Sequence, residues 1–289
     1  MARILVTEEI AAPGLDRLRA AGHEVDVQLG LSPDALIEAV AHANALIIRS
    51  ATQVTADVLA AAPELVAVGR AGIGLDNVDV DAATARGVMV VNAPESNILS
   101  AAEHTVAMLL AQARNIPQAH AALVAGRWER SRWEGVELAD KTLGVIGLGK
   151  IGRLVATRAA AFGMKIAAYD PYVAAPVIRQ LGYEPLDLDE LLAAADFITI
   201  HVAKTKETVG LLDRARLART KPGVRIVNVA RGGIVDEAAL AEAVRSGHVA
   251  GAALDVFVSE PTTESPLFEL PSVIVTPHLG ASTREAQDK

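Results

Sequence analysis

Side chains that could move a proton and hold an anion follow three apolar runs in the second half of the chain. Arg231 follows the first run, Asp255 and Glu260 follow the second, and His278 follows the third. Histidine has an unperturbed pKa near neutrality, and a neighbouring carboxylate such as Glu260 orients the imidazole and favours its protonated form. The guanidinium of Arg231 suits bidentate capture of a carboxylate. Together these groups predict hydride transfer at the hydroxyl-bearing carbon of a small acid, because the hydroxyl proton then needs a base.

The position of these side chains matters more than each residue type taken alone. A lone Arg231 also fits a solvated surface arginine, and a lone His278 also fits a structural histidine. In open parallel sheets, however, ligands bind beyond the carboxyl ends of the strands. Three strands that each end in such a side chain therefore predict one site.

A glycine fingerprint near the middle of the chain predicts where a dinucleotide binds. Gly147, Gly149 and Gly152 follow a strand predicted over residues 143–146 and open a helix predicted over residues 151–162. One glycine permits the tight turn, a second lets the backbone approach a pyrophosphate, and a third lets the helix pack closely on the strand. The helix N-terminus then offers free N–H groups to the phosphates.

Asp170 predicts which dinucleotide binds. It follows the next apolar run, residues 165–169. A carboxylate at this position accepts hydrogen bonds from ribose hydroxyls and repels a 2′-phosphate, so NAD is favoured over NADP. The alternative is a glycine turn followed by an unrelated surface aspartate, and strand, helix and acid in the required order weigh against it.

Composition excludes several other classes of protein. The 289-residue chain has 51% hydrophobic and 21% charged residues, which is typical of a globular protein with a sizeable core. The net charge of −8 argues against generic nucleic-acid binding, and no apolar run has the length of a signal peptide or a membrane helix. The lack of cysteine excludes thiolate and cysteine–zinc chemistry, and no other metal-ligand cluster is expected. We therefore expect a cytoplasmic protein with a small-molecule substrate and neither a nucleic-acid nor a membrane partner.

Strand and helix patterns alternate along the chain, which predicts an α/β protein with parallel strands covered by helices. Residues 1–95 have no phosphate fingerprint at their first strand-to-helix turn, so they are expected to form a flavodoxin-like substrate-binding lobe. The strands expected in this lobe are residues 4–6, 25–29, 45–48, 65–68 and 88–91, and the helices are residues 14–21, 33–43, 55–62 and 80–86.

Residues 96–284 are predicted to form a second lobe, a doubly wound Rossmann domain. Two helices, residues 97–114 and 116–128, are expected to join the lobes and to support a subunit interface. Six strands are expected at residues 143–146, 166–169, 197–200, 224–229, 250–256 and 273–276. The chain stops at Lys289, so residues 285–289 are interpreted as the truncated start of a helix that returns to the first lobe, and the chain as a fragment.

Six motifs in order resemble those of the D-isomer-specific 2-hydroxyacid dehydrogenases, and the resemblance covers essentially the whole chain. The motifs are residues 48–52, 69–77, 147–152, 230–237, 253–257 and 277–283. The resemblance implies two lobes, NAD as the cofactor and a reaction at C2 of a 2-hydroxy acid. The chain departs from the family pattern after His201, where Ala203 and Lys206 occupy positions at which prolines are common.

The resemblance also implies a role for each matching residue. Arg231 would bind the substrate, His278 would be the acid or base, and Glu260 would tune it. The residues implied at the cofactor are Ile73, Gly147, Gly149, Lys150, Ile151, Gly152, Asp170, His201, Val202, Val229, Ala230, Arg231, Asp255, His278, Gly280 and Ala281. The residues implied at the substrate are Arg49, Ser50, Arg70, Gly72, Ile73 and, from a neighbouring subunit, Arg132 or Arg130.

The arginines at the substrate imply a phosphorylated hydroxy acid, because a dianion needs several paired donors. By the resemblance, the reaction is the NAD-dependent oxidation of D-3-phosphoglycerate to 3-phosphohydroxypyruvate, the first step of the phosphorylated route to L-serine, in a homodimer or a larger homo-oligomer. Two alternatives stay open. One is an NADH-dependent reductase of another 2-keto acid such as hydroxypyruvate, glyoxylate or 2-oxoglutarate, and the other is a non-catalytic NAD-sensing interaction protein on the same fold.

Overall fold

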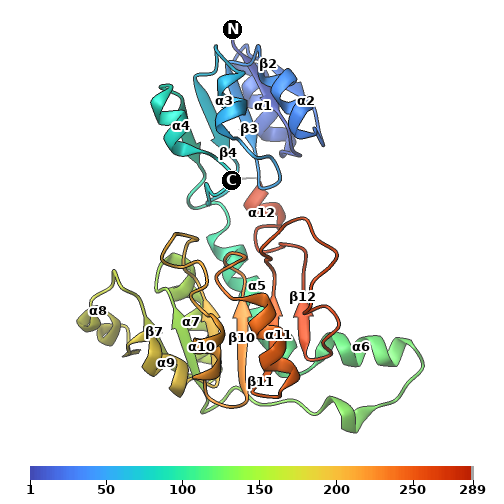
Figure 1. The fold of residues 1–289 in the computed structure, drawn as a ribbon, viewed down its shortest axis with the longest axis vertical. Helices are drawn as coiled ribbons and strands as arrows, with labels where there is room; N and C mark the ends of the chain where they lie inside the picture. The colour runs from blue at the N-terminus through green and yellow to red at the C-terminus, as the bar shows by residue number, and fades with distance from the viewer. Residues whose placement is uncertain (288–289) are drawn as a thin grey trace. The chain divides into compact units, whose positions relative to one another are not determined.

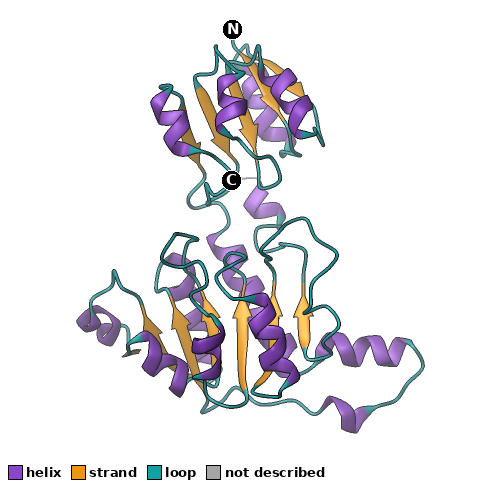
Figure 2. Cartoon of the chain, in the orientation of Figure 1, coloured by secondary structure: helices purple, strands orange, loops and turns teal. Residues whose placement is uncertain are grey.

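The chain divides into two compact units in a computed structural model that describes residues 1–287. Unit 1 comprises residues 1–98 together with the residues from 281 onward, and unit 2 comprises residues 99–280. The sequence predicts the two boundaries at residues 95 and 284, a few residues from those of the structure. In each unit the strands lie between helices (Figure 1; Figure 2).

The sheet of unit 1 is entirely parallel and has the strand order β2-β1-β3-β4-β5 (Figure 1). This is the flavodoxin-like order, so the predicted fold of the first lobe is confirmed. The strands are β1 (Arg3–Val6), β2 (Glu24–Val27), β3 (Ala45–Ile48), β4 (Ala67–Arg70) and β5 (Met89–Asn92).

Three helices of unit 1 begin at residues whose side chains satisfy a free amide. Ser32, Thr55 and Asp79 each accept a hydrogen bond from an amide of the first helical turn, at the starts of α2, α3 and α4. The apolar faces of these three helices pack with the strands into one core. The helices are α1 (Ala12–Ala20), α2 (Pro33–Val40), α3 (Ala56–Ala60), α4 (Val80–Ala85) and α12 (Arg284–Gln287).

The sheet of unit 2 is also parallel and has the order β12-β11-β10-β9-β6-β7-β8. Counted from β6, this is the doubly wound Rossmann order, and the direction of winding reverses between β6 and β9. The predicted fold of the second lobe is therefore confirmed. The strands are β6 (Thr142–Ile146), β7 (Lys165–Tyr169), β8 (Glu184–Pro185), β9 (Phe197–Ile200), β10 (Val224–Asn228), β11 (Val249–Leu254) and β12 (Val273–Val275).

Helices cover both faces of this sheet, and a separate buried cluster lies on each face. The cluster on one face includes apolar residues of α5, α7 and α8, and the cluster on the other includes those of α9, α10 and α11. The helices are α5 (Ile98–Ala113), α6 (Ile116–Val124), α7 (Lys150–Ala161), α8 (Ala175–Gln180), α9 (Leu188–Ala194), α10 (Arg214–Ala218) and α11 (Glu237–Arg245), with a 3-10 helix η1 (Arg130–Trp133).

Two sequence predictions about unit 2 are wrong in detail. The sheet has a seventh strand, β8, which has only two residues and contains a proline, so no apolar run announces it at the sheet edge. The helix predicted over residues 116–128 ends at Val124, because Gly126 adopts φ +77° directly after the last turn. The predicted segment 285–289 falls partly on α12, and residues 288–289 lie outside the described residues.

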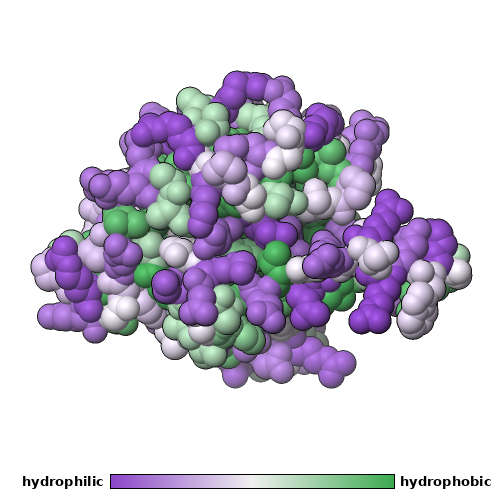
Figure 3. Space-filling view, turned by 90° about the horizontal axis from the view of Figure 1, so that it is seen from below, coloured by the Kyte–Doolittle hydropathy of each residue, from purple (hydrophilic) through white to green (hydrophobic). Residues whose placement is uncertain are grey.

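Within residues 1–287, no helix is both long enough and apolar enough to cross a membrane. The face drawn in Figure 3 is mostly hydrophilic, with apolar groups scattered among the charged ones. Within the same described range, no three His, Asp or Glu side chains form a group that could hold a metal ion.

Candidate active site

The glycine loop of unit 2 joins β6 to α7, at the point where the strand order reverses. Gly147 has φ +94°, a conformation that other residues rarely adopt. A Cβ on Gly152 would overlap the carbonyl oxygen of Gly147, so α7 packs this closely only with glycine there. A Cβ on Gly149 would meet no atom within 4 Å. Gly147 therefore allows the turn, Gly152 allows the close packing contact, and Gly149 leaves an open approach to the helix N-terminus.

Asp170 follows β7 and is fastened to this loop. One carboxylate oxygen accepts a hydrogen bond from the amide of Leu148 (2.7 Å), and the other accepts one from the amide of Tyr172 (2.8 Å). Each carboxylate oxygen has a second lone pair, so the group can still accept from ribose hydroxyls. The residues at this end of the sheet thus fit the adenosine side of a dinucleotide.

His201 follows β9, the other strand at the reversal. Its Nε2 lies 2.9 Å from the hydroxyl oxygen of Thr199, and a Cβ on Gly147 would lie 2.7 Å from its carbonyl oxygen. Burial lowers the pKa of His201 to about 3, so the imidazole is neutral at physiological pH. His201 and Val202 therefore form a wall of the glycine loop, and Lys150 and Ile151 begin the helix that leaves it.

The loop that carries Arg231 is fixed by its neighbours. Asn228 ends β10 and is buried; its Oδ1 accepts from the amide of Ala230 (3.0 Å), and its Nδ2 donates to the carbonyl of Arg231 (2.9 Å). A Cβ on Gly232 would overlap the carbonyl oxygen of Phe257. The backbone of the Arg231 loop therefore lies directly against the start of the loop that bears Glu260. No role for Asn228 is predicted from the sequence, although its place at the strand end was the available signal.

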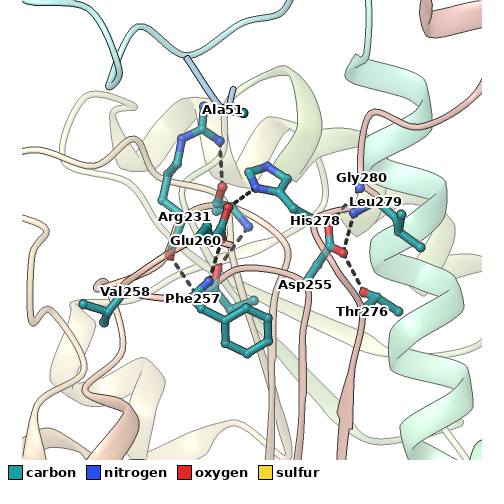
Figure 4. Close-up of polar contacts among 12 residues, drawn as sticks. Ala51, Arg231, Asp255, Phe257, Val258, Glu260, Thr276, His278, Leu279 and Gly280 are labelled. Atoms are coloured by element: carbon teal, nitrogen blue, oxygen red, sulfur yellow. Dashed lines mark hydrogen bonds and ion pairs between the residues drawn. The ribbon is translucent and has the colours of Figure 1, made fainter. Parts of the chain in front are cut away.

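Glu260 and His278 form a hydrogen-bonded pair (Figure 4). The Nδ1 of His278 lies 2.6 Å from Oε2 of Glu260, and Oε1 of Glu260 accepts from the amide of Phe257 (2.7 Å). Burial raises the pKa of Glu260, but the hydrogen bonds from His278 and from the Phe257 amide outweigh this and hold it below its usual 4.5. An ionised Glu260 makes Nδ1 the protonated nitrogen, which leaves Nε2 as the position that takes or gives a proton.

Asp255 follows β11 and supports the loop that bears His278. Its side chain is completely buried, and it accepts hydrogen bonds from the Thr276 hydroxyl (2.6 Å) and the amides of Leu279 (2.7 Å) and Gly280 (2.8 Å) (Figure 4). Its backbone carbonyl accepts from the amide of His278 (2.9 Å). His278 itself has φ +54°, a strained conformation for a residue with a side chain. Asp255 thus holds the residues on both sides of the candidate acid–base group.

In unit 1, Arg49 lies on a loop that follows β3, and a carboxylate accepts hydrogen bonds from the amides of this loop. Glu8 accepts hydrogen bonds from the amides of Arg49 (2.8 Å), Ala51 (3.1 Å) and Thr52 (3.0 Å). The Nδ2 of Asn77 donates to the carbonyls of Arg49 (2.8 Å) and Thr52 (2.6 Å). Neither Glu8 nor Asn77 was singled out as a site residue from the sequence.

A second glycine loop follows β4 in unit 1. Gly72 has φ +152°, and a Cβ there would overlap the guanidinium of Arg70, so the missing side chain makes room for that arginine. The amide of Gly72 donates to the carbonyl of Arg70 (2.9 Å), and Ile73 follows in the same loop. Arg49 and Gly72 line one cleft of unit 1 together with Asn97, Ala281 and Gln287.

The remaining predicted residues are Ser50, Val229 and Arg132. Ser50 is exposed beside Arg49, and Val229 lies close to Gly280. Arg132 lies on η1 in unit 2, where its guanidinium is 3.5 Å from Glu129 and 5.0 Å from the ring centre of Trp133. Within unit 2, therefore, the structure groups the predicted residues into a glycine-loop set and a proton-transfer set, with Arg132 in neither, and unit 1 carries an arginine set of its own.

Comparison with known proteins assigns the chain to a family. Residues 106–280 match the family described as D-isomer specific 2-hydroxyacid dehydrogenase, NAD binding domain. A protein named D-3-phosphoglycerate dehydrogenase from Mycobacterium leprae is 60% identical over 288 residues, which are 99% of this chain and 54% of that protein. The chain thus spans about half the length of the curated relatives it matches.

Solved structures agree with this assignment over nearly their whole length. A Thermus thermophilus protein has a TM-score of 0.90 and 39% identity, with 99% of this chain and 92% of that chain covered. The NAD-dependent formate dehydrogenase from Staphylococcus aureus, in complex with NAD, has a TM-score of 0.88 and 33% identity, with 100% and 91% covered. The predicted cofactor class is confirmed by the domain match. The chain belongs to the D-isomer specific 2-hydroxyacid dehydrogenases, with the family's NAD binding domain at residues 106–280.

Proposed function

We propose that this chain carries out the NAD-dependent interconversion of D-3-phosphoglycerate and 3-phosphohydroxypyruvate, the first step of the phosphorylated route to L-serine. The observation that carries the proposal is the 2.6 Å contact between His278 and Glu260 on an NAD binding domain. The relatives at 50–60% identity that are named D-3-phosphoglycerate dehydrogenase support the choice of substrate.

His278 acts as the base in oxidation and as the acid in reduction. In oxidation its Nε2 takes the proton of the substrate C2 hydroxyl, and the imidazolium that forms is stabilised by Glu260 through Nδ1. A nicotinamide cofactor held by the glycine loop would supply the hydride acceptor in oxidation and, in its reduced form, the hydride donor in reduction. In reduction the protonated Nε2 gives its proton to the carbonyl oxygen, which returns His278 to the neutral state.

Arginines and backbone amides bind the two anionic ends of the substrate in this proposal. Arg231 pairs with the carboxylate and the C2 oxygen, and the loop of Gly72 and Ile73 contributes amides to the same carboxylate. Arg49, Arg70 and Ser50 bind the phosphate, to which charge-assisted donors such as guanidinium groups are suited. Arg132 of a neighbouring subunit completes the phosphate site.

The residues proposed to hold NAD fit the requirements of a dinucleotide. The open space at Gly149 admits the pyrophosphate to the N-terminus of α7, next to Lys150 and Ile151. Asp170 accepts from the ribose hydroxyls, and His201 and Val202 border the same loop. Val229, Ala230, Asp255, Gly280 and Ala281 lie toward the nicotinamide end in this proposal. No step depends on a metal ion.

A substrate panel tests the proposal. The purified chain is assayed for NADH formation with D-3-phosphoglycerate, D-glycerate, D-lactate and D-2-hydroxyglutarate, and for NADH consumption with the corresponding keto acids. We expect a kcat/KM at least about 100-fold higher for the phosphorylated acid than for D-glycerate, because the phosphate adds charge-assisted contacts. Equal or better turnover of an unphosphorylated acid assigns the chain to the reductases of other 2-keto acids. NAD binding without turnover of any acid supports the non-catalytic alternative.

The proposed assembly is a homodimer in the cytoplasm, with residues 1–95 as the substrate lobe and 96–284 as the cofactor lobe. Helix α6 and the segment after it carry four exposed apolar side chains, Ile116, Leu123, Val124 and Trp128, with exposed fractions from 54% to 81%. Such a cluster is typical of a protein–protein interface. We propose no nucleic-acid or membrane partner, in keeping with the net charge of −8.

A further inference from the structure

His104 contacts the buried carboxylate that supports the His278 loop. It lies in the middle of α5, with 20% of its side chain exposed, and its Nε2 is 3.3 Å from Oδ1 of Asp255 and 3.2 Å from the hydroxyl oxygen of Thr276. Asp255 is more than a hundred residues away in the sequence, so no local motif links the two. No role for His104 is predicted from the sequence.

The direction of the hydrogen bonds follows from their distances. The Thr276 hydroxyl lies 2.6 Å from Oδ1 of Asp255 and donates its hydrogen to that carboxylate. The oxygen of Thr276 and the carboxylate of Asp255 are then both acceptors toward His104. The Nε2 of His104 must therefore carry a hydrogen, which it shares between the two.

Asp255 needs these donors because it is a carboxylate with no exposed surface. Burial raises the pKa of Asp255, but the hydrogen bonds from His104, Thr276 and the Leu279 amide outweigh this effect and keep the pKa below its usual 3.8. The ionised carboxylate in turn binds the amides of Leu279 and Gly280. These amides directly follow His278, whose φ of +54° has to be held by its surroundings.

We propose that His104 is a positioning residue for the acid–base step: its Nε2–H, together with Thr276, fixes Asp255, and Asp255 fixes the backbone that aims His278. His104 does not touch the substrate in this proposal, which rests on the proposed function only for its kinetic consequence. The hydrogen-bond chain from α5 to the His278 loop stands on geometry alone.

Two substitutions separate the hydrogen bond from simple packing. His104→Gln places an amide N–H near the position of Nε2, whereas His104→Phe keeps the ring volume and removes the donor. We expect His104→Gln to keep kcat within about 3-fold of the wild type and His104→Phe to lower it about 10-fold, with KM for NAD little changed in both. The exposed His42 in unit 1 provides a matched control, since His42→Gln and His42→Phe should leave kcat unchanged.

A spectroscopic measurement keeps the test independent of turnover. Amide protons that donate to a carboxylate resonate downfield, so the amide signals of Leu279 and Gly280 should move upfield in His104→Phe and stay near their wild-type positions in His104→Gln. If His104→Phe fails to fold, His104→Leu is the second donor-free variant for the same comparison. The proposal is overturned if a folded donor-free variant leaves these two amide signals unchanged or is as active as His104→Gln. Should the wild type not oxidise D-3-phosphoglycerate, the proposed function fails while the amide signals still decide the role of His104.

Discussion

Both units contain a parallel sheet, but the residues that follow the first strand differ in what they leave free to bind an anion. In unit 2, β6 runs into the glycine loop, and Gly149 leaves open space before the N-terminus of α7. In unit 1, β1 is followed by Glu8, whose carboxylate accepts three amides of the loop after β3. One strand end is left open to an incoming anion, and the other is closed by an anion of the protein itself.

The second glycine loop repeats the contrast. Gly72 in unit 1 is needed because the guanidinium of Arg70 occupies the space of its side chain, whereas the space at Gly149 in unit 2 holds no protein atom. Unit 1 thus uses glycine and a half-buried acid to fix arginines, and unit 2 uses glycine to expose backbone donors. In the proposed function, unit 1 recognises its ligand by fixed charges and unit 2 recognises its ligand by close approach of the main chain.

The largest expected effect tests whether the reaction chemistry belongs to unit 2 alone. His278→Gln removes the group that exchanges the proton, and we expect kcat to fall about 1,000-fold, within the usual range for general acid–base catalysis. The dissociation constant of NADH, measured by fluorescence titration, should change less than about 3-fold, because the glycine loop is untouched. Near-normal turnover in this variant would falsify the assignment of His278. His42→Gln is the matched control.

The next effect tests the fixed charges of unit 1. Arg49→Ala removes one charge-assisted donor, so KM for D-3-phosphoglycerate should rise about 10- to 150-fold while KM for D-glycerate changes little. Arg86→Ala, at an exposed arginine of the same unit, is the control and should alter neither constant. Steady-state kinetics with both acids measures the difference. An equal rise for both substrates would mean that Arg49 does not distinguish the phosphate.

Two glycine substitutions in unit 2 distinguish a glycine that leaves room for a ligand from one that allows close packing. Gly149→Ala adds a methyl group where no protein atom lies, so the chain should keep its stability but bind NADH about 10-fold more weakly. Gly152→Ala forces that methyl group against the Gly147 carbonyl and should lower the free energy of unfolding by about 1–3 kcal/mol. Urea unfolding and NADH titration of both variants measure the two effects. Equal destabilisation by both substitutions would remove the contrast between the loops.

How far the sequence predicts this molecule depends on the range of the signal. Strand, turn and helix patterns are local, so β3 and β9 are predicted at their observed bounds and the two sheet types are predicted correctly. The glycine loop and the polar residues at the strand ends can likewise be predicted, because they depend on spacing along the chain. Strand β8 was missed because two residues with a proline give no periodic signal.

The supports of the site could not be predicted, because they join residues that are distant in sequence. Glu8 binds amides more than forty positions away, and His104 meets Asp255 across most of unit 2. A single acid after a strand, or a single histidine in a helix, has many equally good interpretations until the packing is known. Asn228 is intermediate, since its strand-end position was visible but its bond to the Arg231 carbonyl was not.

The smallest expected effect concerns the acid that closes unit 1. Burial raises the pKa of Glu8, but hydrogen bonds from Thr52, Ala51 and Arg49 outweigh it and hold the pKa below its usual 4.5. Because the pKa is depressed in the folded state, the stability it contributes is present above the usual value of 4.5 and is lost as the pH falls through the folded-state value. Glu8→Gln should therefore destabilise the loop of residues 49–52 by about 1–2 kcal/mol near neutral pH, and by much less in acid.

Amide hydrogen exchange measures this loop without requiring the two units to unfold together. The amides of Arg49, Ala51 and Thr52 should lose protection in Glu8→Gln, while the amide of Leu148 in unit 2, which donates to Asp170, should not. The exposed neighbour Glu9 supplies the control, Glu9→Gln. Unchanged protection at residues 49–52 would mean that Asn77 and the sheet suffice to hold the arginine. Loss confined to those residues would show that the half-buried carboxylate of Glu8 binds amides of its own unit, whereas the open loop of unit 2 leaves its amides to a ligand.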